Sequence, residues 1–85
     1  MFKTKTAGGN NNICGGQVYR IRKEKVPKMS QRALADRLQL YGMDVDKNAV
    51  QRIECGKRFV TDIELIALAK ALETDVSRLL YGKNN

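Results

Sequence analysis

The sequence contains no histidine and no tryptophan, and only two cysteines, Cys14 and Cys55. A tetrahedral metal site needs about four ligands, usually at paired short spacings, and two isolated cysteines do not supply them. Without histidine, and with no serine or cysteine beside a plausible base, acyl-transfer and general acid–base chemistry lack their usual groups. We therefore predict a protein that is not an enzyme and holds no metal or cofactor, with both thiols reduced in a cytosolic setting.

Long apolar runs are also absent. No segment approaches the roughly 20 consecutive apolar residues that span a bilayer, and residues 1–12 lack the apolar region of a secretory signal. The chain has 85 residues, and a domain of this size buries only about 60% of its unfolded surface, which leaves little room for a cleft. We expect a cytoplasmic protein without membrane contact, made of a disordered polar tail over 1–12 and one domain over 13–85.

Acidic residues are scarce in the first part of the chain. Residues 1–37 contain nine lysines and arginines but only Glu24 and Asp36 as acids, whereas residues 38–85 contain seven of each sign. The net charge of +7 therefore lies in the first 37 residues. Such a surface attracts polyanions through long-range electrostatics and counterion release. A membrane-binding helix needs large apolar side chains opposite its cations, and the segment 16–25 has few, so nucleic acid is the favoured partner.

What the sequence does contain is a series of short helical patterns. An apolar face with helical spacing spans 16–25, and Pro27 ends it because proline disfavours helical geometry in the preceding residue. A capping box over 61–64 begins a later helix, and Thr74 or Asp75 caps the last one. No segment alternates like a strand. With two further helices in the middle of the chain, these patterns predict an all-α fold of five short helices.

The two middle helices are joined by a glycine-containing connection. Ser30 is placed to cap the first, about 30–41, and Gly42 to end it in a left-handed conformation. Asp46 is placed to cap the second, about 47–55. The residues predicted to face inward are Ala33, Leu34, Leu38, Tyr41, Met43, Val45, Ala49, Val50 and Ile53.

The second of these helices leaves its other residues facing outward, namely Lys47, Asn48, Gln51 and Arg52. Amides and cations on one exposed helical face match the donors and acceptors that base edges present in a major groove. The same residue types also form ordinary solvated faces. From these residues alone, both interpretations stay open.

Three motifs, in the same order and spacing, resemble the phage lambda-type repressor and Cro family of helix-turn-helix proteins, also called the Xre family. They are SQRALADRL, AVQRIECGKR, and ELIALAKAL followed by DVSRLL. With the first helix included, the resemblance covers about four-fifths of the chain. It implies a compact five-helix, lambda repressor-like domain of bacterial or phage origin. Such a domain binds double-stranded DNA sequence-specifically, with the helix at 47–55 in the major groove, and regulates transcription, most often as a repressor.

The resemblance also assigns roles to residues. It implies that bases are read by Lys47, Asn48, Gln51 and Arg52, and that the DNA backbone is contacted by Gln31, Arg32, Lys57 and Arg58. It further implies an ion pair between Arg22 and Glu54 that ties the first helix to the third. The connection over 40–46 departs from the family, because it is about five residues longer than the usual tight turn. This insertion changes the expected angle between the two helices.

The predicted partners follow from the small size of the domain. A homodimer on a palindromic operator is expected, with half-sites roughly 34 Å apart. The dimer is expected to be weak or to form only on DNA, through Ile66, Tyr81 and their neighbours. Two alternatives remain open: an antitoxin-type autoregulator that also binds a toxin protein, and a protein-interaction module that has lost DNA binding. The second alternative predicts no salt-dependent binding to any duplex.

Overall fold

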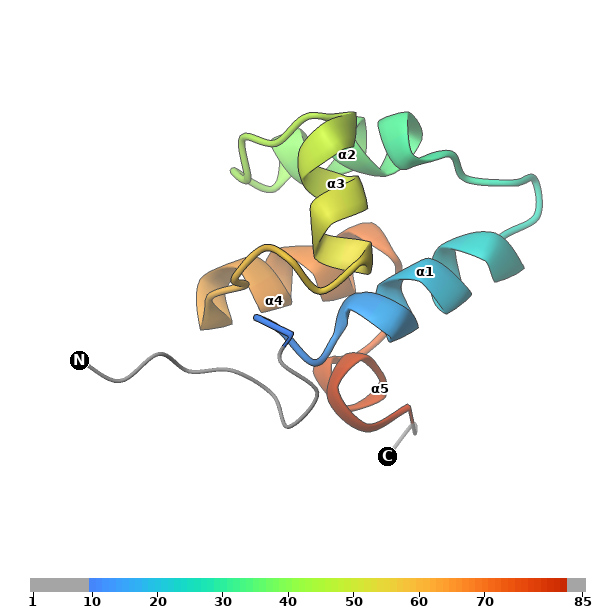
Figure 1. Cartoon of the computed structure of the whole chain (residues 1–85). Helices are drawn as coiled ribbons and strands as arrows, with labels where there is room; N and C mark the ends of the chain where they lie inside the picture. The colour runs from blue at the N-terminus through green and yellow to red at the C-terminus, as the bar shows by residue number, and fades with distance from the viewer. Residues whose placement is uncertain (1–9, 83–85) are drawn as a thin grey trace.

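The computed structural model describes residues 10–82, and in that range the chain forms five α-helices and no strand. The helices are α1 Gly15–Glu24, α2 Gln31–Leu40, α3 Lys47–Glu54, α4 Asp62–Ala71 and α5 Val76–Tyr81. Figure 1 shows α2 and α3 together at the top of the molecule, with α1, α4 and α5 beneath them. None of the helices in this range is long and apolar enough to cross a membrane. The predicted all-α, five-helix fold is confirmed.

Side chains cap four of the helices at the predicted places. Ser30, Asp46, Thr61 and Asp75 each accept a hydrogen bond from the backbone N–H three residues further on, at 2.8 to 3.2 Å. Thr61 also forms the predicted capping box with Glu64. These bonds satisfy N–H groups that the first turn of a helix leaves without partners. The starts of α2, α3, α4 and α5 are therefore encoded locally.

The helices α2 and α3 also end in the same way. Gly42 after α2 and Gly56 after α3 have φ angles of +84° and +78°, a left-handed conformation that glycine adopts without steric cost. In both turns the next residue donates its N–H to a carbonyl five residues back, at 3.0 Å for Met43 and 2.8 Å for Lys57. This Schellman pattern satisfies carbonyls that a helix end leaves free and turns the chain sharply.

One residue predicted for the core lies outside it. Tyr41 is 50% exposed, because α2 ends at Leu40 and the helical spacing that would place Tyr41 inward stops there. The turn at Gly42 brings Met43 and Val45 inward instead, and each is only 5% exposed. The inward positions of Met43 and Val45 were predicted, so the long connection contributes to the core rather than lying on the surface.

The core lies between all five helices. Its fully buried side chains are Cys14, Val18, Leu34, Leu38, Val50, Ile53, Leu68, Leu72 and Leu79. The helix α3 packs against both α1 and α2, while α4 packs against α2 and α5. Because α3 buries Val50 and Ile53 between two neighbours, the direction of its outward face is set by packing on two sides.

The two thiols lie in opposite environments, because Cys14 is buried and Cys55 is exposed. We therefore expect them to react differently with a thiol reagent. Burial raises the pKa of Cys14 to about 11, whereas Cys55 is exposed. Since the thiolate is the reactive form, a disulfide reagent at pH 8 is expected to label one thiol per folded chain, at Cys55, and the second only after unfolding. The folded protein should also lose stability as pH rises from 9.0 toward 11, because the unfolded chain ionises Cys14 first. Rapid labelling of both thiols in the folded protein would contradict this arrangement.

Candidate nucleic-acid interface

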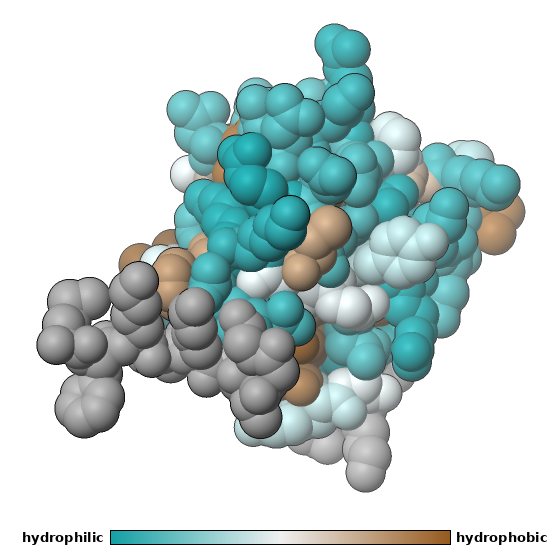
Figure 2. Space-filling model, in the orientation of Figure 1, coloured by the Kyte–Doolittle hydropathy of each residue, from teal (hydrophilic) through white to brown (hydrophobic). Residues whose placement is uncertain are grey.

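The outward face of α3 is polar and exposed. Lys47, Asn48, Gln51 and Arg52 are all exposed, while Ala49, Val50 and Ile53 on the opposite side are between 0 and 7% exposed. Figure 2 shows that hydrophilic side chains cover the α2 and α3 side of the molecule. The helix therefore presents two cations and two amides together on one ridge, without an apolar residue among them.

A groove runs between α2 and the start of α3. Arg32 of α2 lines it together with Lys47 and Asn48 of α3, so one residue predicted to contact the DNA backbone lies beside two predicted to read bases. Asp46 also lines this groove, but its carboxylate accepts the Ala49 N–H at 2.8 Å as the cap of α3. The cap thereby gives this acidic side chain a structural partner inside the protein.

A buried ion pair holds α3 in place from below. Arg22 Nε lies 2.6 Å from Glu54 Oε2, and Arg22 Nη2 lies 3.0 Å from Glu54 Oε1. The two side chains are only 8% and 4% exposed. Arg22 Nη1 also donates to the Met29 carbonyl oxygen at 3.0 Å. The expected Arg22–Glu54 pair is therefore present and bidentate. Its two parallel hydrogen bonds fix the planes of the guanidinium and the carboxylate relative to each other.

Gln31 joins the same network. Its Nε2 donates to Glu54 Oε1 at 3.0 Å, so the first residue of α2 is linked directly to the last residue of α3. Together with Arg22, this contact ties α1, the start of α2 and the end of α3 to one carboxylate. The two helices of the motif therefore keep a fixed angle at this end, although their connection is long.

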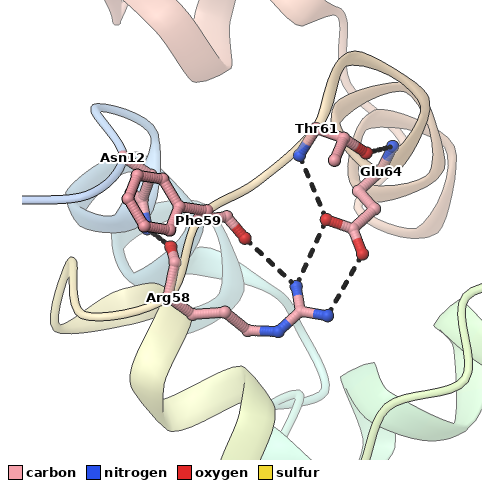
Figure 3. A network of polar contacts seen from close by, with 5 residues as sticks. All are labelled: Asn12, Arg58, Phe59, Thr61 and Glu64. Carbon is pink, nitrogen blue, oxygen red and sulfur yellow. Dashed lines mark hydrogen bonds and ion pairs between the residues drawn. The ribbon is translucent and has the colours of Figure 1, made fainter. Parts of the chain in front are cut away.

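The loop after α3 carries the remaining two predicted site residues. Lys57 is exposed, and Arg58 is half-buried. The guanidinium of Arg58 lies against the Glu64 carboxylate, with nitrogen–oxygen distances of 3.1 and 3.3 Å (Figure 3). Of the two neighbouring cations, only Lys57 projects from the loop without a carboxylate beside it among residues 10–82.

Two asparagines that precede α1 hold this loop, and their roles were not predicted from the sequence. Residues 1–9 of the predicted disordered tail lie outside the described residues, while residues 10–12 are described. Asn11 donates from its N–H to the Gly56 carbonyl oxygen at 2.6 Å and from Nδ2 to the Lys57 carbonyl oxygen at 2.8 Å. Unsatisfied carbonyls at the end of a helix need such donors. These contacts place Asn11 against the loop that follows α3.

Asn12 contacts both the end of α3 and the start of α1. Its Nδ2 donates to the carbonyl oxygens of Ile53 at 3.1 Å and Arg58 at 2.7 Å, while its Oδ1 accepts the Gly15 N–H at 2.8 Å. At Gly15 the backbones of α1 and α3 meet so closely that a Cβ there would lie 2.2 Å from the Ile53 carbonyl oxygen. Asparagine side chains often accept such hydrogen bonds from nearby backbone N–H groups, so only the contact with Gly15 has a local signal in the sequence.

Replacing Asn12 by alanine is expected to lower the free energy of unfolding by about 1–3 kcal/mol, because the Arg58 carbonyl oxygen and the Gly15 N–H lose their hydrogen bonds to Asn12 in a partly buried place. Urea unfolding followed by circular dichroism measures this change. Asn48→Ala is the matched control, since Asn48 is exposed on α3, and its effect should stay within about 0.5 kcal/mol. Equal stabilities for the two variants would show that the contacts of Asn12 do not hold the domain together.

Comparison with known proteins gives two related solved structures. No protein-family model matches the chain, and no curated protein matches it. The crystal structure of the P22 c2 repressor in complex with a synthetic operator is similar, with 26% identity over 85% of this chain and 98% of that chain, and a TM-score of 0.64. The solution structure of the DNA-binding domain of the P22 c2 repressor has 26% identity over 89% and 91% of the two chains, with a TM-score of 0.67. The similarity extends across nearly the whole of both neighbours.

Proposed function

We infer that this chain, which has the lambda repressor-like helix-turn-helix fold, binds double-stranded DNA sequence-specifically and regulates transcription. The observation that carries this conclusion is the exposed face of α3, held in a fixed direction by the buried Arg22–Glu54 pair. The structural neighbour that was solved on operator DNA has the same fold. The protein is a binding protein rather than an enzyme, and its place of action is the cytoplasm of a bacterial or phage-infected cell.

On this account α3 lies in the major groove and reads bases. The base-reading residues are Lys47, Asn48, Gln51 and Arg52. An asparagine amide pairs with the N6 and N7 groups of adenine, and an arginine or lysine pairs with O6 and N7 of guanine. All four side chains are exposed, so they reach a groove without any change in the core.

Contacts to the DNA backbone set the register of α3. Gln31 and Arg32 begin α2, and Lys57 lies in the loop after α3. Unpaired N–H groups of the first turn of a helix attract phosphate, which favours a phosphate at the start of α2. The roles of these residues depend on the fixed angle that Gln31 and Glu54 maintain between α2 and α3.

Repression follows from occupation of a promoter by a dimer. One domain with a single short reading helix contacts few base pairs, so a palindromic operator with two half-sites raises both affinity and specificity. Ile66 and Tyr81 are 50% and 72% exposed and supply apolar surface for a weak homodimer that forms on DNA.

Repeated selection from random-sequence duplexes tests this function. We expect a palindromic sequence to be enriched and to bind at least about a thousandfold more tightly than random DNA, with an affinity that falls steeply as salt rises. If no sequence is enriched and binding to every duplex stays weak, the conclusion is wrong, and the exposed face of α3 serves a protein partner instead.

A further inference from the structure

The guanidinium of Arg58 already has an anionic partner inside the protein. Its Nη2 donates to Glu64 Oε2 at 3.1 Å and its Nη1 to Glu64 Oε1 at 3.3 Å, with a weaker contact to the Phe59 carbonyl oxygen at 3.4 Å. This two-pronged geometry is also how an arginine grips a phosphate. The Glu64 carboxylate and a DNA phosphate therefore compete for the same donors.

Glu64 is fixed before any DNA arrives. Its Oε1 also accepts the Thr61 N–H at 3.0 Å and so completes the capping box of α4, which Figure 3 shows beside the arginine. Although partial burial raises it, the hydrogen bonds from Thr61 and the charge of Arg58 hold the pKa of the Glu64 carboxyl below its usual value. The carboxylate is therefore ionised and oriented at neutral pH.

The backbone of Arg58 is held as well. Its carbonyl oxygen accepts a hydrogen bond from Asn12 at 2.7 Å, and its N–H donates to the Arg52 carbonyl oxygen at 3.3 Å. These bonds hold the loop backbone at Arg58 beside Glu64. Arg58 and Glu64 are 29% and 23% exposed at their side chains, so water competes for this pair less than for a fully solvated one.

On the basis of the proposed DNA-binding function, we propose that Glu64 is a positioning residue that withholds Arg58 from the DNA backbone. Lys57 is then the cation that the loop after α3 presents to a phosphate, and Arg58 fixes the shape of the loop. Glu64 lowers the affinity for every DNA sequence equally, because the contact that it prevents is a backbone contact that carries no sequence information. The sequence pattern around Glu64 indicates only that it helps to cap α4.

The test compares Glu64→Gln, Arg58→Gln and the double variant with the wild-type protein. Glutamine keeps the capping box but releases the arginine. We expect Glu64→Gln to steepen the slope of log affinity against log salt by about 0.9, so that its advantage over the wild type grows about threefold between 200 and 50 mM salt. Arg58→Gln alone should leave the slope unchanged, and the double variant should return to the wild-type slope.

Glu73→Gln is the control for net charge, because Glu73 follows the opposite end of α4 and pairs with Arg37 at 3.5 Å. Three results would each overturn the proposal. The salt slope of Glu64→Gln could equal that of Glu73→Gln, or the steeper slope could persist in the double variant. The third such result is a slope for Arg58→Gln that is shallower than that of the wild type. These results leave the DNA-binding function intact, since the wild-type protein still binds with a salt-dependent affinity. If the wild-type protein binds no duplex, both the function and this role of Glu64 are wrong.

Discussion

Replacing Arg22 by alanine is expected to lower the free energy of unfolding by about 3–5 kcal/mol, a large share of the 5–15 kcal/mol that stabilises a small domain. The reason is the Glu54 carboxylate, which is 4% exposed and would lose the guanidinium that neutralises it. Gln31 supplies only one hydrogen bond to that carboxylate. A single neutral donor does not replace a cation, so a buried, uncompensated charge would remain.

Urea unfolding followed by circular dichroism measures the loss. Glu24→Ala is the control: Glu24 also pairs with an arginine, Arg78, at 2.6 Å, but its side chain is 53% exposed, and a solvated pair contributes at most about 1 kcal/mol. The variant that lacks Arg22 should be partly unfolded near 37 °C, and the control should not. An Arg22→Ala protein as stable as the wild type would contradict the account of how α3 is held.

The second large effect concerns Arg52. Its replacement by alanine is expected to lower the affinity for the selected operator about 5- to 150-fold, which corresponds to the 1–3 kcal/mol of a bidentate contact with a guanine. The affinity for random DNA should fall much less, because only one cation is lost. Discrimination at one base pair in each half-site should disappear, since α3 presents Arg52 at a single position.

Competition with operators substituted at each base pair measures this discrimination. Lys70→Ala removes the same charge from an exposed site on α4, outside the proposed interface, and should change operator affinity less than about twofold if the contact is specific to α3. An Arg52→Ala protein that loses operator and random DNA binding by the same factor, with every base preference unchanged, would show that Arg52 does not read a base.

Local signals explain which parts of the fold could be predicted. Ser30, Asp46 and Asp75 act on backbone groups only three residues away, so the sequence around each cap contains the whole interaction. The outward face of α3 followed in the same way from the helical spacing of its apolar residues. Tyr41 shows the limit of that spacing, because the turn at Gly42 ends the helix one residue before Tyr41.

Long-range contacts explain what the sequence did not reveal. The partners of Asn12 at Ile53 and Arg58 are 41 and 46 residues away, and no local pattern connects an asparagine to carbonyls at that distance. Arg22 and Glu54 are 32 residues apart, and only the family resemblance suggested their pairing. For Arg58, the motif indicated a cation near DNA but could not show that the cap of the next helix lies against it.

If α3 reads bases in the major groove, methylation of bases in that groove of the selected operator should interfere with binding. Methylation of guanine N7 modifies the major groove, whereas methylation of adenine N3 modifies the minor groove. We expect N7 methylation to block binding at guanines in two half-sites about one helical turn apart, and Arg52→Ala to remove the block at one guanine per half-site. Two results would contradict base reading in the major groove. One is interference only from methylation of adenine N3. The other is no interference at any guanine, when the operator contains guanines in both half-sites.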